Sequence, residues 1–346
     1  MKRFHDERDL VAATIYDIAR ETGFAIGTIS RVLNNAENVN PATRTAVLEV
    51  MERLGYQPNG VARSLASGST RTVALVLPDL ANPFFASMAA GVEEVADAND
   101  YTVLVCSGSS TAERERRYLR LLTARQVDGL LLVGSNLSID ELVESTSQTS
   151  VVQIDREVKG ADAVVVKLDH RLGGRMATEH LLDLGHTKVA FLGGDQDNDA
   201  ARARYWGYQD ALRDRGVEPT AALATRGALD LEGGAAAMHG LLEQGREFTA
   251  VFASNDMMAI GAIGVLQDAG RSVPGDISVV GFDDSYLARY ASPPLTTIRQ
   301  SGDELGRRAA EILLSQIDKK TFPTRVILDP VLIVRASTSQ IKGASI

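Results

Sequence analysis

The sequence is poor in the residues that carry much of enzymatic and redox chemistry. Its 346 residues include one cysteine, one tryptophan and five histidines, and only 5% are aromatic. The single Cys106 excludes an intramolecular disulfide, and a lone thiol inside the apolar run YTVLVC is more typical of a core position than of a nucleophile. The five histidines lack the spacing of metal ligands. They are His5, His170, His180, His186 and His239, of which His180 and His186 are expected to cap a helix end or face solvent.

No motif of a nucleotide-dependent or hydrolytic enzyme is present. The sequence lacks a Walker phosphate loop, a GxGxxG after its first predicted strand and a GxSxG nucleophile turn. No apolar run reaches membrane-spanning length, and the first residues, MKRFHDERDLVAA, carry too many charges for a secretory signal. We therefore expect a cytoplasmic protein that is not an enzyme and uses no cofactor or metal ion.

Residues 14 to 33 have the pattern of two short helices joined by a glycine turn. Thr14 can cap a helix start, and Asp17 completes a capping box that suits the positive end of the helix dipole. Gly23 is the residue type that commonly ends a helix in the left-handed conformation. A second helix is predicted from Ile26 to Leu33. The arrangement is that of a helix-turn-helix.

The residues after this pair complete a small helical unit. Asn40 and Pro41 form a cap and first-position pair that starts a third helix. Groups of three short helices also occur as ordinary packing units that bind nothing. The helix pattern alone therefore leaves two interpretations open, a DNA-binding unit and a purely structural one. Gly60 to Ala66 is too short to hold a helix alone in water. It is either a flexible tether or a segment that folds against a partner, with Leu65 as an apolar wedge for the minor groove.

The stretch from residue 14 to residue 68 resembles the headpiece of the lactose/galactose repressor family of bacterial transcription regulators. IYDIAR, GTISRVLNN, ATR and GYQPNGVARSLASG match the family's pattern almost continuously, and a looser match extends to the end of the chain. The resemblance implies recognition-helix residues in the major groove of operator DNA and a hinge helix that folds on the operator. The DNA-binding residues expected from the helix pattern and the resemblance are Tyr16, Ile26, Gly27, Thr28, Ser30, Arg31, Asn34, Asn40, Thr43, Tyr56, Asn59, Ala62 and Leu65.

Two positions depart from the family's pattern. Ala25 replaces the serine usual before the recognition helix, and Gly27 has no side chain to read a base. Arg31 is then the best candidate for direct readout, because a guanidinium can grip guanine O6 and N7 together. A helix-turn-helix that reads a palindromic site normally does so as a dimer. We therefore expect a homodimeric repressor on a pseudo-palindromic operator, and the short tail without a heptad favours a dimer over a tetramer.

The charge of the chain is distributed unevenly. The net charge is −9, but residues 1 to 71 hold nine Lys and Arg against eight Asp and Glu, which is +1 and leaves −10 for the remainder. An acidic body limits nonspecific DNA binding, and a weakly basic headpiece cannot hold DNA by charge alone. Two headpieces on a dimer would strengthen the interaction.

From residue 71 onward, short apolar runs alternate with stretches of helical spacing, which predicts parallel α/β sheets. The predicted strands are 72–77, 102–106, 129–133, 151–154, 189–192, 250–253 and 277–281. The predicted helices include 85–99, 112–125, 172–184, 205–215, 233–244 and 256–269. There are enough units for two similar lobes, and small ligands usually bind at the carboxyl ends of such strands.

The resemblance adds a periplasmic-binding-protein-like body in which the chain crosses three times between two lobes. The expected crossings lie near 155–169, 283–297 and 327. The expected fold is an all-α headpiece (1–57, with an ordered core from 14 to 57), a hinge helix and linker (58–70), and a two-lobed effector domain (71–340) that also forms the dimer. Its N-terminal lobe would hold 71–160 and 296–325, and its C-terminal lobe 161–295 and 326–340.

Polar residues just after predicted strands are candidates for an effector site. By the family's pattern, the cleft is lined by Phe84, Asp155, Arg204, Asn255 and Asp283. Carboxylates, an amide and a guanidinium around an aromatic face can hydrogen-bond a ring of hydroxyls, which indicates a sugar or sugar derivative. Structural roles remain open for three sites: a salt bridge between Asp155 and Arg156, a helix cap at Asp256, and simple core packing of Phe84.

Two further residues bear on the nature of the effector. Leu229 stands where relatives often place a stacking aromatic, which weakens the argument for a purine, and Trp206 is expected to pack rather than stack on a ligand. The competing hypothesis is a sugar-binding protein of a transporter. It shares the body, but it explains neither the fused headpiece nor the missing export signal.

Overall fold

The computed structural model describes residues 13–33, 36, 38–56, 68–108, 111–134, 137, 139–146, 149–156, 164–194 and 198–341. The chain divides into two compact units, Met1–Thr70 and Arg71–Ile346. Of the expected DNA contacts, Asn34, Asn59, Ala62 and Leu65 lie outside the described residues, as does most of the predicted hinge helix. Within the described ranges, no helix has the length and apolar character needed to cross a membrane.

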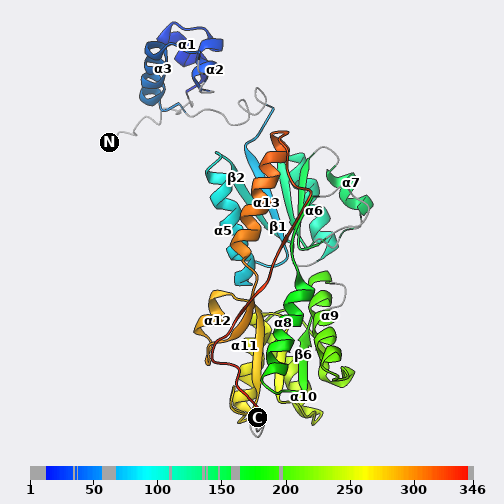
Figure 1. The fold of residues 1–346 in the computed structure, drawn as a ribbon. Helices are drawn as coiled ribbons and strands as arrows, with labels where there is room; N and C mark the ends of the chain where they lie inside the picture. The colour runs from blue at the N-terminus through cyan, green and yellow to red at the C-terminus, as the bar shows by residue number, and fades with distance from the viewer. Residues whose placement is uncertain are drawn as a thin grey trace, which may run out of the picture. The chain divides into compact units, whose positions relative to one another are not determined.

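The described part of the first unit contains three helices, which are labelled in Figure 1 and share a small apolar core. They are α1 (Ile15–Thr22), α2 (Ile26–Leu33) and α3 (Pro41–Leu54). The core contains one side chain from α1, two from α2 and one from α3, all buried: Ile18, Ile29, Val32 and Val47. The predicted bounds of the first two helices and the start of the third agree with the structure.

The ends of these helices follow the sequence signals. Gly23 is left-handed with φ of 71°, and the Asn40 side chain accepts the Ala42 amide to cap α3. The capping box predicted for Thr14 and Asp17 is present at the start of α1. The Asp17 carboxylate accepts the Thr14 amide at 2.9 Å and also the Thr14 hydroxyl at 2.7 Å. The Thr14 hydroxyl hydrogen bond holds the pKa of Asp17 below its usual value.

The second unit contains two six-stranded sheets. The first sheet is parallel, in the order β11-β5-β4-β3-β1-β2. Its strands are β1 (Thr72–Leu77), β2 (Thr102–Ser107), β3 (Gly129–Val133), β4 (Ser150–Ile154), β5 (Val164–Leu168) and β11 (Arg325–Leu328). The second sheet has the order β12-β10-β9-β8-β6-β7 and is parallel except for β12. Its strands are β6 (Val189–Gly193), β7 (Ala224–Arg226), β8 (Ala250–Ala253), β9 (Ser278–Asp283), β10 (Thr296–Arg299) and β12 (Val331–Ile333).

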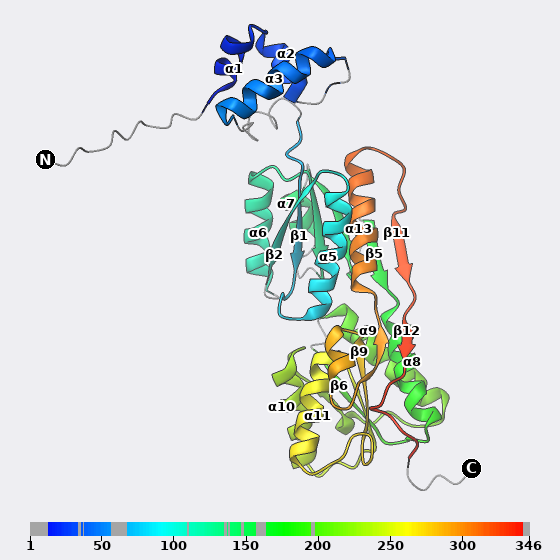
Figure 2. The same ribbon diagram turned by 90° about the vertical axis from the view of Figure 1, so that its left-hand side faces the viewer.

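Helices cover both faces of each sheet, as Figures 1 and 2 show. On the first sheet, α5 (Pro83–Asp97) and α13 (Gly302–Ile317) pack on one face, and α6 (Ala112–Ala124) and α7 (Ile139–Thr146) on the other. On the second sheet, α8 (His170–Asp183) and α9 (Asp199–Asp214) pack on one face, and α10 (Leu231–Glu243) and α11 (Asp256–Asp268) on the other. The short elements η1 (Ala221–Leu223) and α12 (Tyr286–Tyr290) complete this lobe. Because both faces are covered, the central strands are buried, as their continuous apolar runs predict.

The lobe boundaries differ from those expected. The chain crosses between sheets after β5, between β10 and α13, and between β11 and β12. Residues 164–168 and 326–328 therefore belong to the N-terminal lobe, and 296–299 to the C-terminal lobe, contrary to the expected divisions at 161, 296 and 326. The cause is local: VVVKL and TTIR are strands that the apolar-run pattern did not separate from the connections around them.

Candidate functional sites

Three of the residues expected to meet DNA, Ile26, Gly27 and Arg31, are exposed on α2. Ile26 is 40% exposed, and Tyr16 on α1 is 67% exposed, although both are large apolar or aromatic side chains. A Cβ built at Gly27 would meet nothing within 4 Å, so core packing does not require glycine there. The other described candidates divide between the exposed Arg31 and Asn40 and the half-buried Thr28, Ser30, Thr43 and Tyr56. An open face of this kind is accessible to a macromolecule.

Arg31 differs from the other arginines of the described headpiece. Arg20 pairs with Asp17, and Arg53 pairs with Glu21 across the unit. Arg44 donates to the carbonyl of Ala36 at 2.6 Å. Arg31 is exposed on α2, and its side chain makes no hydrogen bond or ion pair within residues 13–33, 36 and 38–56. Its guanidinium is therefore available to an external acceptor.

The second unit contains a cavity of about 570 Å³ bounded by residues from both lobes. It lies beside the carboxyl ends of β1, β3, β4, β8 and β9, where the topology of parallel sheets favours a ligand. The five predicted effector residues come from five separate elements or loops, and all of them line it. Their role in ligand binding stays a prediction; their convergence is a feature of the structure.

Arg204 is the buried cation of this cavity and is fixed on several sides. Its Nε lies 3.3 Å from His170 Nδ1, one terminal nitrogen donates to the Ser254 carbonyl at 2.5 Å, and its guanidinium carbon lies 3.9 Å from the centre of the Phe282 ring. His170 on α8 and Arg204 on α9 can meet because the two helices approach closely. A Cβ at Gly174 of α8 would lie 2.2 Å from the Arg204 carbonyl oxygen. Burial lowers the pKa of Arg204, although nearby carboxylates oppose that effect.

His170 connects Arg204 to the N-terminal lobe. Its Nδ1 accepts from the guanidinium, so its ring proton is on Nε2, which lies 3.1 Å from an Asp155 carboxylate oxygen without the alignment of a hydrogen bond. Burial lowers the pKa of His170, and the charge of Arg204 acts in the same direction. Burial raises the pKa of Asp155, but the electrostatic attraction of His170 and the hydrogen bond from the Leu168 amide, 3.1 Å, outweigh burial and hold this pKa below its usual value. The suggested ion pair between Asp155 and Arg156 is not formed, because Arg156 lies 3.7 Å from Asp199 instead.

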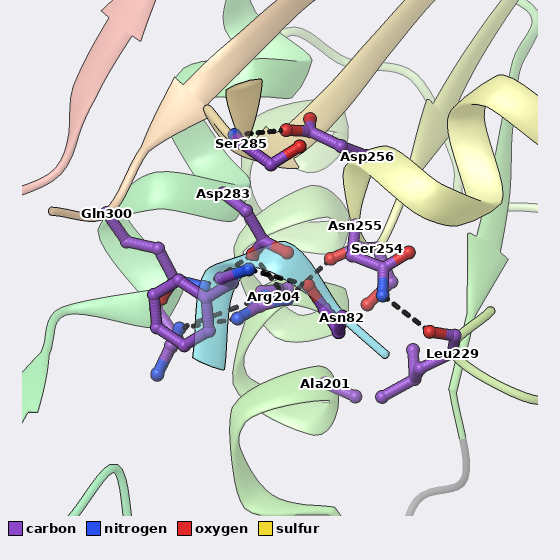
Figure 3. A network of polar contacts seen from close by, with 12 residues as sticks. Asn82, Ala201, Arg204, Leu229, Ser254, Asn255, Asp256, Asp283, Ser285 and Gln300 are labelled. Carbon is purple, nitrogen blue, oxygen red and sulfur yellow. Dashed lines mark hydrogen bonds and ion pairs between the residues drawn. The ribbon is translucent and has the colours of Figure 1, made fainter. Parts of the chain in front are cut away.

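Asp283 is the central carboxylate of the site. Figure 3 shows it between Arg204 and Gln300, with Asn82 nearby. Arg204 is 3.9 Å from one of its oxygens, and Gln300 donates to the same oxygen. Burial raises the pKa of Asp283 to about 7, although the charge of Arg204 and the hydrogen bonds of Gln300 and Asn82 oppose the rise. Its backbone is left-handed with φ of 113°, which is rare for a residue with a side chain.

The structure tests the structural roles that the sequence left open for Asp256 and Phe84. Asn255, not Asp256, caps α11 by accepting the Met258 amide at 2.8 Å, and it donates to the Leu229 carbonyl at 2.8 Å. Asp256 is fully buried, accepting from the Ser285 amide and the Thr297 hydroxyl. Phe84 is 5% exposed and belongs to the core while also lining the cavity. Leu229 lines the cavity as well, whereas Trp206 is 45% exposed and packs under Arg202.

Sequence reasoning missed several buried residues of the site, among them His170, Gln300 and Glu115. His170 and Gln300 each follow a strand end, β5 and β10, so the rule that selected Asp283 would have selected them had those strands been recognised. The Oε1 atom of Gln300 has no hydrogen-bond partner in the described part of the chain. His180 and His186 also have a different role from the expected one, because they bind Thr338 and Ser339 and thereby hold the C-terminal segment.

Comparison with known proteins finds both parts of this architecture. Residues 14–59 match the family described as bacterial regulatory proteins, lacI family, and residues 178–338 match the periplasmic binding protein-like domain. The chain is 39% identical over 329 residues to the HTH-type transcriptional regulator GalR of Escherichia coli strain K12, covering 94% of this chain and 96% of that protein. It is 35% identical over 336 residues to the transcriptional repressor PurR of Haemophilus influenzae strain PittEE, covering 95% and 99%.

Solved structures resemble the whole chain as well. The lac repressor dimer bound to operator and the anti-inducer ONPF is 29% identical, with a TM-score of 0.84 over 95% of this chain and 99% of that one. A complex of the transcriptional regulator CelR with cellobiose is 34% identical, with a TM-score of 0.71 over 94% and 99%. These relatives are DNA-binding regulators rather than enzymes. The chain belongs to the lacI family of bacterial regulatory proteins.

Proposed function

We propose that this protein is a transcriptional repressor that binds a pseudo-palindromic operator as a homodimer and responds to a small sugar in its cleft. The observation that carries the proposal is the presence in one chain of an exposed recognition face on α2 and a cavity of about 570 Å³ lined by buried Arg204 and Asp283. The relatives support both halves: one structure contains an operator, and others contain cellobiose or ribose.

On DNA, α2 enters the major groove and Arg31 reads a base edge. The neighbouring Tyr16 and Asn40 contact phosphate or sugar and set the register of the helix. Leu65 and the residues around it form the hinge segment that meets the minor groove at the centre of the operator. Because phosphate contacts supply much of the affinity, operator binding falls steeply as the salt concentration rises. The protein acts in the cytoplasm, where its DNA is.

In the cleft, Asp283 and Arg204 bind adjacent hydroxyls of the sugar. A carboxylate accepts from two hydroxyls while a guanidinium donates to their oxygens, so the pair recognises a diol in both directions. Asn255, Asp155 and Phe84 complete the site with an amide, a second carboxylate and an apolar face. A ligand without the hydroxyls leaves these buried groups unpaired and is rejected.

Ligand binding is coupled to DNA binding through closure of the lobes. Asp155 is at the end of β4 in one lobe, and His170 and Arg204 are in the other, so a sugar held between them changes how the lobes meet. The N-terminal lobes of a dimer then meet differently, which alters whether the paired hinge segments fold. The size of the effect is limited by the difference in the sugar's affinity for the two arrangements.

The test begins with an operator selected from a random DNA pool by the full-length protein. A site with two-fold symmetry, bound by two chains with an affinity that a sugar changes, is the expected result. Asp283→Ala should abolish the sugar response and keep operator binding. An asymmetric site bound by one chain, or unchanged sugar affinity in Asp283→Ala measured by calorimetry, would refute the corresponding half of the proposal.

A further inference from the structure

The side chains around the cavity give it an unbalanced charge. Two guanidinium groups, Arg156 and Arg204, face six carboxylates, so the formal charge of the lining is −4, and −3 if Asp283 is counted as protonated. The carboxylates are Asp79, Glu115, Asp155, Asp199, Asp230 and Asp283. A phosphate or carboxylate placed in this cavity would therefore meet like charges in a partly desolvated space, which is unfavourable.

The groups that could offset this repulsion are already engaged. Five helices, α5, α6, α9, α10 and α11, begin at the cavity, and helix N-termini are ordinarily good anion-binding sites. The first turn of α6 contains Glu113 and Glu115, which already complement its dipole although Thr111 makes no capping hydrogen bond. At each of the other four helices the N-cap side chain accepts an amide of its own first turn. The donor amides are Phe84 N to Asn82 at 2.9 Å, Ala201 N to Asn198 at 3.0 Å, Gly233 N to Asp230 at 2.7 Å and Met258 N to Asn255 at 2.8 Å.

Acidic residues in the first turns of the helices and the existing contacts of the two arginines also make the cavity less able to bind an anion. The first turns of α9, α10 and α11 contain Asp199, Glu232 and Asp256, which already complement the helix dipoles. Arg204 gives its donors to His170 and the Ser254 carbonyl and lies beside Asp283. Arg156 lies 3.7 Å from Asp199. Each guanidinium charge is therefore already balanced by a carboxylate of the protein, although N–H donors of Arg204 remain for uncharged hydroxyls.

What the cavity does offer is acceptors. Gln300 is 2% exposed and lines the cavity, and its Oε1 has no hydrogen-bond partner in the described ranges. Glu115, 5% exposed on α6, and Asp79 add carboxylates on the N-terminal lobe. The buried Gln300 Oε1 without a donor is costly, so a ligand that donates an O–H or N–H group to it gains most here.

We infer that the cleft takes donor-rich ligands without a negative charge, uncharged or amine-bearing, and rejects the phosphorylated and acidic forms of the same sugars. The inference rests on the proposed sugar site and adds a rule of charge to it. It assigns Asp79 and Glu115 the role of excluding anions, because they belong to the N-terminal lobe, whereas Arg204 belongs to the C-terminal lobe. The protein thus responds to a free sugar rather than to its phosphorylated product.

Calorimetry on the full-length protein at 150 mM salt tests the rule with matched sets. Each set contains a neutral sugar (D-glucose, D-galactose or D-ribose), its terminal phosphate, its uronic acid where one exists, and the 2-amino-2-deoxy form of the hexoses. For the set whose parent binds, we expect the phosphate and the uronate to bind roughly 100-fold more weakly or worse, since like charges brought together cost several kcal/mol. The amino sugar should bind within about threefold of the parent or more tightly, because its ammonium group is attracted by the carboxylates of the cavity instead of being repelled.

Charge-removing variants assign the effect to residues. Asp79→Asn with Glu115→Gln should narrow the gap between the neutral sugar and its phosphate by about tenfold or more. Glu113→Gln is the matched control, since Glu113 is exposed on the same helix and does not line the cavity, and it should leave the gap unchanged.

The outcomes separate the charge rule from the sugar site. A phosphate or uronate that binds as tightly as its neutral parent overturns the charge rule while the sugar site stands. If the affinity difference between the neutral sugar and its phosphate persists in the double variant, Asp79 and Glu115 do not exclude anions. If only the phosphates or uronates bind, both the charge rule and the proposed neutral sugar are wrong.

Discussion

The headpiece and the two-lobed body bury different kinds of residue. In the described headpiece every buried side chain is apolar, and the polar residues expected to meet DNA are exposed or half-buried. The body buries His170, Arg204, Asp256 and Asp283, each no more than 6% exposed. Recognition is therefore assigned to a surface in one unit and to a buried polar network in the other. Substitutions should cost binding alone in the first, but binding and stability together in the second.

The largest expected effect is on the stability of the body. Arg204→Met removes a buried cation from beside Asp283 and Asp155, so the free energy of unfolding should fall by about 3–5 kcal/mol. Denaturant unfolding followed through Trp206, the single tryptophan, measures it. Arg215→Met at the end of the same helix is the control. Its exposed pair with Asp183 should be worth less than about 1 kcal/mol. Equal stability of the two variants would contradict the proposed difference between the units.

The next effect is on DNA binding and leaves stability unchanged. Arg31→Ala should weaken operator binding by about 1–3 kcal/mol, because a bidentate contact to guanine contributes that much discrimination. Sugar affinity and body stability should not change. Arg53→Ala, which breaks only the ion pair with Glu21, is the control, and fluorescence anisotropy on a labelled operator measures both. Equal losses in the two variants would remove Arg31 from the role of base reader.

These two variants also illustrate what the sequence can reveal. The three helices of the described headpiece could be predicted, because their caps, glycine turn and apolar spacing are local, whereas the role of Arg31 as a base reader stays a prediction. The site in the body could be predicted only through family resemblance, since its residues come from positions 82 to 300 and meet through folding. His170 and Gln300 were missed because β5 and β10 were not recognised as strands, and no local pattern records that Asp155 pairs with His170 rather than with its neighbour Arg156.

A third effect is a pH dependence confined to the body. Burial raises the pKa of Asp283 to about 7, so the free protein takes up a proton there as the pH falls below 7. A sugar that needs the ionised carboxylate must displace this proton, and its affinity should fall by up to about tenfold per pH unit below 7. Calorimetry at pH 5, 6, 7 and 8 gives the profile. Asp283→Asn should bind the sugar weakly, and its sugar affinity should not depend on pH in this range. If the pH dependence survives in the variant, another group is responsible for the titration.

The same carboxylate predicts a stability trend of defined sign. Because the folded-state pKa of Asp283 lies above that of the unfolded chain, the folded state binds more protons between about pH 4 and 7. Its contribution to body stability is therefore full below pH 4 and is lost as the pH rises through 7. Comparing wild type with Asp283→Asn isolates this contribution from that of His170, whose lowered pKa acts in the opposite sense. Parallel pH profiles for the two proteins would contradict it.

The smallest effect is on the stability of the headpiece. Gly27→Ala should stabilise it by about 0.5 kcal/mol, because alanine favours helix and the added Cβ meets nothing within 4 Å. Gly23→Ala should instead destabilise it by about 1 kcal/mol, because Gly23 has φ of 71°. Hydrogen exchange of the headpiece amides in the full chain measures both. A stabilising Gly23→Ala would contradict the left-handed conformation at the end of α1, and a destabilising Gly27→Ala would contradict the open space beside Gly27 in α2.

The central claim, that a sugar in the body governs DNA binding by the headpiece, is tested most directly by titrating the operator with protein with and without the neutral sugar that binds best. In wild type the sugar should change operator affinity by about 5-fold to 150-fold, the usual range of coupling between two sites. In Asp283→Ala the two titrations should coincide while operator affinity without sugar stays at the wild-type value. Wild-type protein that binds the sugar with no change in operator affinity, or a sugar effect that persists undiminished in Asp283→Ala, would contradict the account.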